Sequence, residues 1–264
     1  MMIDIYQLDA FADKLFSGNP AAVCLLDKWI PEDVMQNIAA ENNLAETAFL
    51  VPKDNIYEIR WFTPTHEVEL CGHATLASAY VLMNELQITE SNPIHFYSHH
   101  SGDLYVRKLE DGLFELDFPT DQYQEHPIPD VIRSSFNVTP LECYKGKTDY
   151  LLVFSSQADI ENMSPDLKLL SKADGRGFIV TAPGRDADFV SRFFAPQIGI
   201  DEDPVTGSSH TTLTPYWSNR LNKTKLEAAQ LSKRGGRLTC TFQHDRTLIA
   251  GAVVLYLKGK IQTA

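Results

Sequence analysis

Two eighteen-residue stretches of this chain share one pattern, and their repetition limits the fold more than any other feature. ELCGHATLASAYVLMNEL covers residues 69–86, and PVTGSSHTTLTPYWSNRL covers residues 204–221. In each stretch a small polar residue, Cys71 or Thr206, stands before a glycine, and a leucine follows fifteen positions after it. Each pattern is typical of a tight turn that leads into a helix. The sequence therefore predicts the same helical element twice.

The segments before the two stretches also repeat in order. PEDVMQNIAAEN, residues 31–42, has a proline at its start and apolar residues at helical spacing, and SPDLKLLSKAD at 164–174 begins in the same way. Short β-rich runs follow each of them: TAFLV and EIRWF in the first copy, GFIVTAP and FVSRFFAP in the second. A shared order of this kind predicts two copies of one small α+β unit. A chance repeat is the alternative.

A polar stretch that contains prolines indicates where one unit ends. It lies at 119–130, so we expect an N-terminal α+β domain over residues 1–122 and a C-terminal α+β domain over 123–264. The last strand could cross back to the first domain. Pro215 lies inside the second predicted helix, where it should remove one main-chain hydrogen bond and kink the axis.

Composition and charge exclude several classes of partner. The net charge of −12 repels phosphate backbones, so we expect no nucleic acid. No apolar run reaches the ~20 residues that a membrane span needs, and the first residues lack the pattern of a signal peptide. We therefore expect no membrane partner and a cytoplasmic location. The four cysteines are widely spaced, which favours reduced thiols over disulfides or a zinc site.

The start of each repeated helix is a candidate anion-binding site. The first turn of a helix has unpaired N–H groups at the positive end of the helix dipole. Gly72 and Gly207 would let a ligand come close, and the amide of Ser208 follows. If a pseudo-twofold axis relates the domains, the two helix starts can face each other and hold one small carboxylate. The alternative for each is a plain helix cap.

The candidate base is Glu46 in NNLAETAFL. Symmetric thiol chemistry needs a cysteine in both copies, but Thr206 stands in the second, and its hydroxyl is too weakly acidic to act as a base. Glu46 leads an apolar β-run without a Lys or Arg within five positions. A carboxyl held there would be partly desolvated, which suits a group that takes and returns a proton. An exposed carboxylate at a strand end is the alternative.

Three further residues are candidates with open alternatives. His73 could bind the ligand or supply a proton, or it could be a satisfied interior histidine. Asp203 could orient or protonate the ligand, or it could be an acidic turn residue before a proline. Asn19 in FSGNPAAV could face the site or simply form the turn. Cys71 and His73 are two residues apart, a spacing that we take as poor for a thiolate–imidazole pair.

Six segments together resemble the PhzF-like family of phenazine-biosynthesis-type isomerases, which are relatives of diaminopimelate epimerase and proline racemase. They are FSGNPAAV, NLAETAFL, WFTPTHEVELCGHATLASA, FFAP, DEDPVTGSSH and RGGRL. They span essentially the whole chain in the family's order. The resemblance implies an α+β fold of two tandem, pseudo-twofold-related domains, each a mixed barrel-like β-sheet around a central helix, with the site in the interdomain cleft.

The resemblance also implies roles for particular residues. The glutamate of the family's ETAF motif, its base, is here Glu46, and the histidine of CGHAT is His73. The aspartate and serine of DPxTGS are Asp203 and Ser208. Ser209 departs from the alanine that the family usually has there.

The family's characterised reaction moves a proton within a cyclic dienyl amino acid without a cofactor. We therefore expect a biosynthetic, cofactor-independent and metal-independent isomerase that acts on a small carboxylate-bearing substrate. Glu46, His73 and Asp203 would be catalytic, and Asn19, Gly72, Gly207 and Ser208 would bind substrate. We also expect a homodimer. The alternatives are a thiol-dependent epimerase or hydrolase that uses Cys71, and a non-catalytic small-molecule binding protein.

Overall fold

The chain forms two compact units, and the computed structural model describes its residues 1–88 and 92–263. The first unit comprises Met1–Asp117 together with Ala250–Ala264, and the second comprises Phe118–Ile249. The expected change of domain after residue 122 therefore differs from the observed division, which follows Asp117. The C-terminal segment belongs to the first unit.

The described residues of the first unit form a mixed sheet with three helical segments. Its elements are β1 (Met2–Ala10), β2 (Asn19–Leu25), α1 (Glu32–Asn42), β3 (Glu46–Lys53), β4 (Ile56–Phe62), β5 (Glu67–Val68), α2 (Gly72–Tyr80), the π-helical η1 (Val81–Glu85), β6 (Ile94–Ser98), β7 (Gly102–Lys108), β8 (Phe114–Pro119) and the last strand, β18 (Val253–Gln262). The pairs β18–β1, β1–β2, β3–β4, β6–β7 and β7–β8 are antiparallel. The pairs β2–β3 and β4–β6 are parallel, as helical crossovers allow.

The second unit repeats this design. Its elements are β9 (Gln124–Glu125), α3 (Asp130–Ser135), β10 (Glu142–Lys145), β11 (Asp149–Val153), α4 (Gln157–Glu161), α5 (Leu167–Leu170), β12 (Gly177–Pro183), β13 (Phe189–Ala195), the 3₁₀ segment η2 (Pro196–Ile198), β14 (Ile200–Asp203), α6 (Gly207–Leu221), β15 (Lys225–Gln230), β16 (Gly236–Gln243) and β17 (Arg246–Gly251). The pairs β11–β12 and β13–β15 are parallel, and β10–β11, β12–β13 and β15–β16 are antiparallel.

The order and direction of these pairings match between the units, which supports the predicted duplication. β2, β3, β4 and β6 correspond to β11, β12, β13 and β15, with α2 and α6 in the same crossover. The short strands β5 and β14 pair with β4 and β13 respectively. Cys71 and Thr206 are both helix N-caps with extended main chain, as their shared position predicts.

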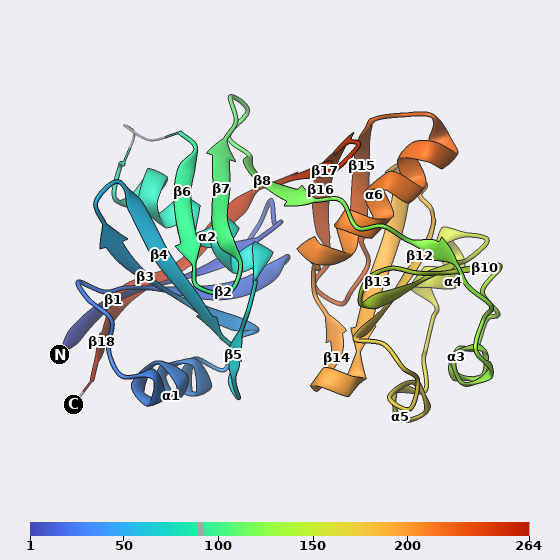
Figure 1. Ribbon diagram of the computed structural model, residues 1–264, viewed down its shortest axis with the longest axis horizontal. Coiled ribbons are helices and arrows are strands. Elements are labelled where there is room, and N and C mark those ends of the chain that lie inside the picture. The colour runs from blue at the N-terminus through green and yellow to red at the C-terminus, as the bar shows by residue number, and fades with distance from the viewer. Residues whose placement is uncertain (89–91, 264) are drawn as a thin grey trace. The chain divides into compact units, whose positions relative to one another are not determined.

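Each repeated helix lies inside its sheet. Residues His73–Ala79 of α2 are all buried, and α2 contacts β1, β2, β3, β7 and β18, so strands from across the sheet surround it (Figure 1). Helix α6 contacts β11, β15 and β16, and its Trp217 stacks on Phe189 of β13. The expected barrel-like sheet around a central helix is confirmed. No helix among the described residues has both the length and the apolar composition needed to cross a membrane.

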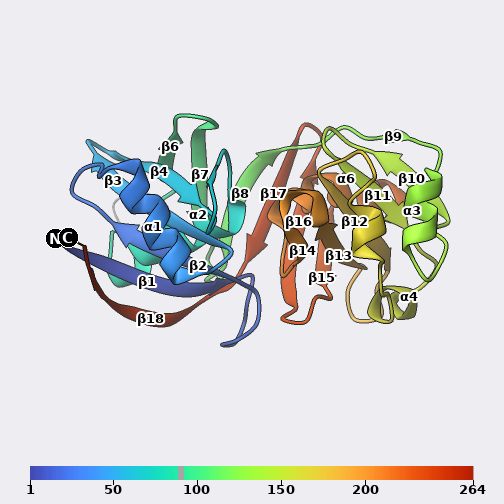
Figure 2. The ribbon, with the colours of Figure 1, turned by 90° about the horizontal axis from the view of Figure 1, so that it is seen from below.

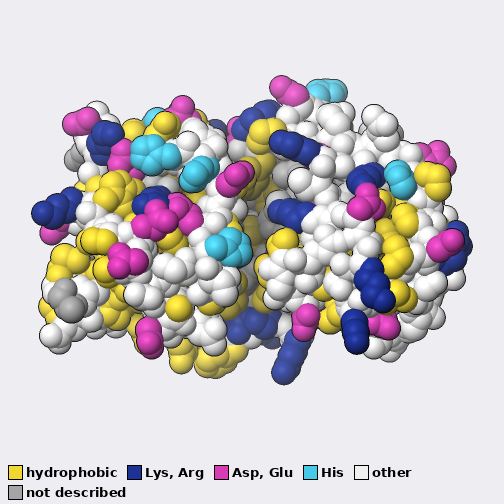
Figure 3. All heavy atoms as spheres, turned by 60° about the horizontal axis from the view of Figure 1, so that its bottom comes forward, with side chains coloured by type: hydrophobic (Ala, Val, Ile, Leu, Met, Phe, Trp, Pro, Cys, Tyr) yellow, Lys and Arg dark blue, Asp and Glu magenta, His cyan; other side chains and the backbone are white. Residues whose placement is uncertain are grey.

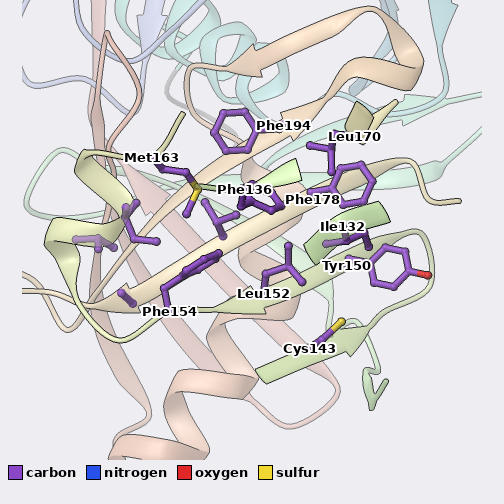
Figure 4. Packing of buried hydrophobic residues seen from close by; sticks show 14 of the residues in the cluster. Ile132, Phe136, Cys143, Tyr150, Leu152, Phe154, Met163, Leu170, Phe178 and Phe194 are labelled. Atoms are coloured by element: carbon purple, nitrogen blue, oxygen red, sulfur yellow. The ribbon is translucent and has the colours of Figure 1, made fainter. Parts of the chain in front are cut away.

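Shorter helices cover the outer faces of the sheets. Helix α1 buries Met35, Ile38 and Ala39 against side chains of β1–β4, and Figure 2 shows it lying across that face of the strands. In the second unit, Ile132 of α3, Ile160 of α4 and Leu170 of α5 pack with aromatic side chains such as Phe154 and Phe178 (Figure 4). Alternate residues of the strands that these helices cover, such as β3 and β12, therefore face an inner and an outer core.

One helix of the predicted repeat is much shorter than expected. We predicted a proline-led helix across SPDLKLLSKAD, but only the four residues of α5 are helical there, with Asp166 as the N-cap. The crossover in the second unit is shared with α4, which Ser156 caps through a capping box. The two copies thus match in sheet order more closely than in their outer helices.

Pro215 does not end α6, which runs unbroken from Gly207 to Leu221. Because proline has no N–H, the carbonyl of Thr211 loses its usual helical donor. The main-chain N–H of Asp121 donates to that carbonyl instead, at 3.2 Å, and the Asp121 carboxylate accepts from Thr212. The segment that enters the second unit therefore supplies the hydrogen bond that Pro215 cannot donate.

Candidate active site

Glu46, Cys71 and His73 form one cluster in the first unit. Glu46 is the first residue of β3, Cys71 is the N-cap of α2, and His73 lies in its first turn. Glu46 Oε2 is 3.2 Å from His73 Nε2, and Cys71 Sγ is 3.5 Å from His73 Nδ1. Glu46 Oε2 is buried, and no described residue forms a well-aligned hydrogen bond with it. One atom from each side chain lies within 4.8 Å of the others, a spacing that a metal ion could also use.

The contact between Cys71 and His73 corrects the sequence interpretation, which took their spacing as poor for a pair. The N-cap residue has extended main chain, so its side chain turns back along the helix start and meets the second helical residue. The thiol and the imidazole are therefore in contact, with Glu46 on the other nitrogen of the ring.

The surroundings set the protonation of this cluster. Burial and the negative charge of Glu46 raise the pKa of Cys71 to about 11, although His73 opposes the shift. Cys71 is therefore a neutral thiol near pH 7. Burial alone would lower the pKa of His73, but its contact with Cys71 and the negative charge of Glu46 outweigh burial and raise the pKa well above the ordinary 6.5. The direction of this shift favours the protonated form of His73 beside Glu46.

A second cluster surrounds the N-cap of α6. The Thr206 N–H donates to Gln230 Oε1 at 2.9 Å, and Gln230 Nε2 donates to the carbonyl of Asp203 at 2.8 Å. The Thr206 hydroxyl donates to the Asp203 carboxylate. Gln230 is fully buried at the end of β15. The sequence reading singled out Asp203 and Thr206 but missed Gln230, because nothing in KLEAAQ shows which strand face turns inward.

The residue of the second unit that corresponds to Glu46 is Gly177, which has no side chain. Ala21 pairs with Glu46 in the first unit, and Asp149 pairs with Gly177 in the second. A Cβ at Gly177 would lie 2.1 Å from the ring of Phe193, so no carboxylate fits there. The preceding residue, Arg176, pairs with the buried Asp149 and donates to the Ser208 hydroxyl at 3.2 Å. Sequence reasoning missed this cation.

The remaining predicted site residues lie at the starts of elements. Asn19 is the buried first residue of β2, which pairs with β3 from Ala21 onward. Gly72 and Gly207 are the first helical residues of α2 and α6. Ser208 is exposed in the first turn of α6. In the first unit, the strand starts and the helix start thus bring Glu46, His73 and Gly72 into one cluster.

His210 is a buried residue that the sequence analysis did not single out. Its Nδ1 lies 2.8 Å from the carbonyl of Thr206, to which only a protonated nitrogen can donate. Its Nε2 is buried and has no partner among residues 1–88 and 92–263. Burial lowers its pKa to about 4, and the bond to Thr206 only partly opposes this. The sequence signal for His210 was its position four residues after Thr206, because that spacing places it one helical turn after the N-cap.

We expect acid to weaken the second unit through His210. Unfolded His210 takes up a proton near pH 6.5, but the folded protein does so near pH 4. Between these values the unfolded state binds more protons than the folded state. The free energy of unfolding therefore decreases as the pH is lowered from 7 to 4, by at most about 3 kcal/mol. Urea unfolding between pH 7 and 4 measures this. In His210→Asn, which keeps a donor for Thr206 but does not titrate, this part of the loss should disappear; an unchanged slope would contradict the assignment.

Acidic and basic side chains are interspersed on the surface of each unit in the face that Figure 3 shows. The chain nevertheless carries a net charge of −12. Any anionic ligand must therefore be attracted by local groups, such as helix N–H groups, rather than by the charge of the whole molecule.

Comparisons with known proteins agree with this architecture. A family model described as phenazine biosynthesis-like protein matches residues 8–259. A protein of Pseudomonas aeruginosa named as an uncharacterized isomerase is 46% identical over 261 residues, which cover 99% of each chain. The crystal structure of a PhzF-family phenazine biosynthesis protein from Enterococcus faecalis superposes with a TM-score of 0.96 at 46% identity, over 100% of both chains.

A more distant likeness concerns the fold alone. A hydroxyproline epimerase from Agrobacterium vitis is only 9% identical, yet it superposes with a TM-score of 0.64 over 98% of this chain and 92% of its own. The α+β fold of the epimerases is thus confirmed. Because both the family model and close relatives span nearly the whole chain, the protein belongs to the phenazine biosynthesis-like PhzC/PhzF family and is an isomerase.

Proposed function

We propose that the protein is a cofactor-independent isomerase that shifts a proton within a small, carboxylate-bearing substrate, with Glu46 as the acid/base group. Glu46 removes a proton from a carbon next to an activating group and returns it to another carbon. His73 and Asp203 position the ligand and its protons. The amides at Gly72 and Gly207–Ser208, with Asn19, bind the carboxylate and stabilise the developing negative charge.

The state of the Glu46 carboxylate is the observation that carries this proposal. Oε2 is buried and has no well-aligned hydrogen bond from any described residue, but the His73 imidazole lies 3.2 Å away. A buried carboxylate oxygen whose neighbouring donor is poorly aligned is costly unless a ligand completes it. A substrate C–H is the kind of group that such an oxygen can approach without competing for an existing bond.

The thiol alternative has one observation in its favour and one against it. Cys71 Sγ contacts His73, as a thiolate–imidazole pair would require. However, the pKa of Cys71 is raised to about 11 by burial and by Glu46, and a neutral thiol is a poor nucleophile and a poor base. Glu46 is therefore the better candidate.

Hydrogen exchange with solvent tests the proposal directly. The purified protein is incubated in D₂O, without added cofactor, with a panel of amino acids and unsaturated carboxylic acids, and proton NMR follows each C–H signal. We expect one class of carboxylate to gain deuterium at a carbon. Cys71→Ala should keep most of this activity, and Thr206→Cys should not create racemase activity.

Each rival predicts a different outcome. Loss of exchange in a folded Cys71→Ala would favour thiol chemistry. Tight retention of a co-purified ligand, identified by mass spectrometry, with no deuterium uptake would favour a binding protein.

A further inference from the structure

A closed hydrogen-bond network joins the N-cap of α6 to Asp203. Gln230 Oε1 accepts from the Thr206 N–H at 2.9 Å. Gln230 Nε2 donates to the carbonyl of Asp203 at 2.8 Å and to the Thr206 hydroxyl at 3.2 Å. The Thr206 hydroxyl lies within hydrogen-bond distance of Asp203 Oδ2. Gln230 is 0% exposed and Thr206 is 6% exposed, so water does not compete for most of these bonds.

The chemistry of the main-chain partners fixes the direction of the bonds that Gln230 makes. A main-chain N–H only donates, so the Gln230 atom beside it must be oxygen. A main-chain carbonyl only accepts, so the other Gln230 atom must be nitrogen, and that nitrogen also donates to the Thr206 hydroxyl. The one hydroxyl hydrogen of Thr206 is then left to donate to Asp203. Oδ2 is thereby held as an acceptor.

Other contacts keep Thr206 in this orientation. Its carbonyl accepts from the Ser209 hydroxyl and from His210 Nδ1, both at 2.8 Å. Every polar group of Thr206 is therefore paired, and rotating its hydroxyl away from Asp203 would break the bond from Gln230.

We propose that Thr206 and Gln230 are positioning residues that hold Asp203 as an ionised hydrogen-bond acceptor, so that Asp203 binds a donor group of the substrate and does not carry the migrating proton. This inference rests on the proposed function and assigns different tasks to the two acids. Glu46 has an oxygen without an aligned donor and takes up the proton. Asp203 has a fixed donor on Oδ2 and remains a carboxylate.

The charged groups around Asp203 agree with this division. Arg176, which precedes β12, interacts electrostatically with Asp203. The neighbouring Glu202 is paired with Arg192 of β13. His210 in α6 is neutral above about pH 4, the value to which burial lowers its pKa. Arg176 therefore favours the ionised form of Asp203, together with the Thr206 hydroxyl.

The network also explains why the duplicated position holds threonine rather than cysteine. A thiol is a weak hydrogen-bond donor, whereas a hydroxyl donates strongly to a carboxylate. In the first unit the matching residue, Cys71, contacts His73, and the acid there comes from the start of β3 rather than from the end of the short strand before the helix. The N-cap Thr206 thus donates directly to the acid of its unit, whereas the N-cap Cys71 contacts the histidine beside the acid of its unit.

Carbon NMR of the Asp203 carboxyl group, in the full-length protein without substrate, tests the inference. In the unsubstituted protein we expect the chemical shift of a carboxylate throughout pH 5 to 8. Thr206→Ser keeps the hydroxyl and should titrate as the unsubstituted protein does. Thr206→Val has nearly the same shape but no donor, so the midpoint of the Asp203 titration should rise by about one pH unit or more.

Two results would overturn the inference. One is an Asp203 carboxyl that titrates between pH 5 and 8 in the unsubstituted protein, a measurement that needs no variant to fold. The other is a folded Thr206→Val in which the titration of Asp203 is unchanged. Neither result bears on Glu46, because that role is tested by deuterium exchange in Glu46→Gln.

Discussion

Replacing Glu46 with glutamine is expected to lower the turnover of proton transfer by at least about 10²-fold, the lower end of what an acid/base group contributes. Glutamine keeps the size of the side chain and can still place an oxygen beside His73 Nε2, but it cannot accept the proton from carbon. Substrate affinity should change little. The measurement is the rate of deuterium incorporation into whichever carboxylate of the panel reacts, with affinity measured by calorimetry.

A matched control separates this effect from the loss of a negative charge. Glu110 is an exposed glutamate in the same unit, in the turn between β7 and β8, so Glu110→Gln removes the same charge away from the cluster. Its turnover should equal that of the unsubstituted protein. Unaltered turnover in a purified, folded Glu46→Gln would rule out Glu46 as the base.

The features that the sequence predicts best are those set by local patterns. Both repeated helices begin directly after Cys71 and Thr206, because a glycine and an extended N-cap mark each start. The β-runs that follow the predicted outer helices are strands. The helix that was predicted over 164–174 is mostly wrong, because its proline and apolar residues satisfy a helix start but not a continuous buried face.

The site depends on contacts that a sequence pattern does not contain. Glu46 could be chosen from its apolar surroundings, but its 3.2 Å separation from His73 follows from strand β3 beginning beside the start of helix α2. Gln230 meets Thr206 only because β15 pairs parallel to β13 in one register. A shift of that register by one residue would turn Gln230 to the other face of the sheet.

The asymmetry of the duplicated site has a steric cause. In the first unit the start of β3 has room for the carboxylate of Glu46. In the second unit the ring of Phe193 fills the matching space, so only glycine fits at 177. The acid of the second unit, Asp203, instead lies at the end of β14, where the N-cap of α6 can bind it. The two acids therefore lie at different positions of the duplicated sheet.

The largest stability effect is expected at Gly18, which precedes Asn19. Its φ of +68° is left-handed, and a Cβ there would lie 2.2 Å from the carbonyl oxygen of Ala10 and 2.7 Å from Cβ of Ala12. Gly18→Ala therefore adds both backbone strain and a clash with main-chain atoms that cannot move aside separately. We expect it to lower the free energy of unfolding by about 4 kcal/mol, as the sum of strain and overpacking.

Gly102 is the matched control, because it separates the clash from the strain. Its φ of +71° is nearly the same, but a Cβ there would meet no heavy atom within 4 Å. Gly102→Ala should therefore cost only the left-handed strain, about 1 kcal/mol. Urea unfolding of the two variants measures both values at once. Equal losses would show that the clash at Gly18 is relieved by movement of the loop between β1 and β2, and that the position of Asn19 does not depend on a glycine there.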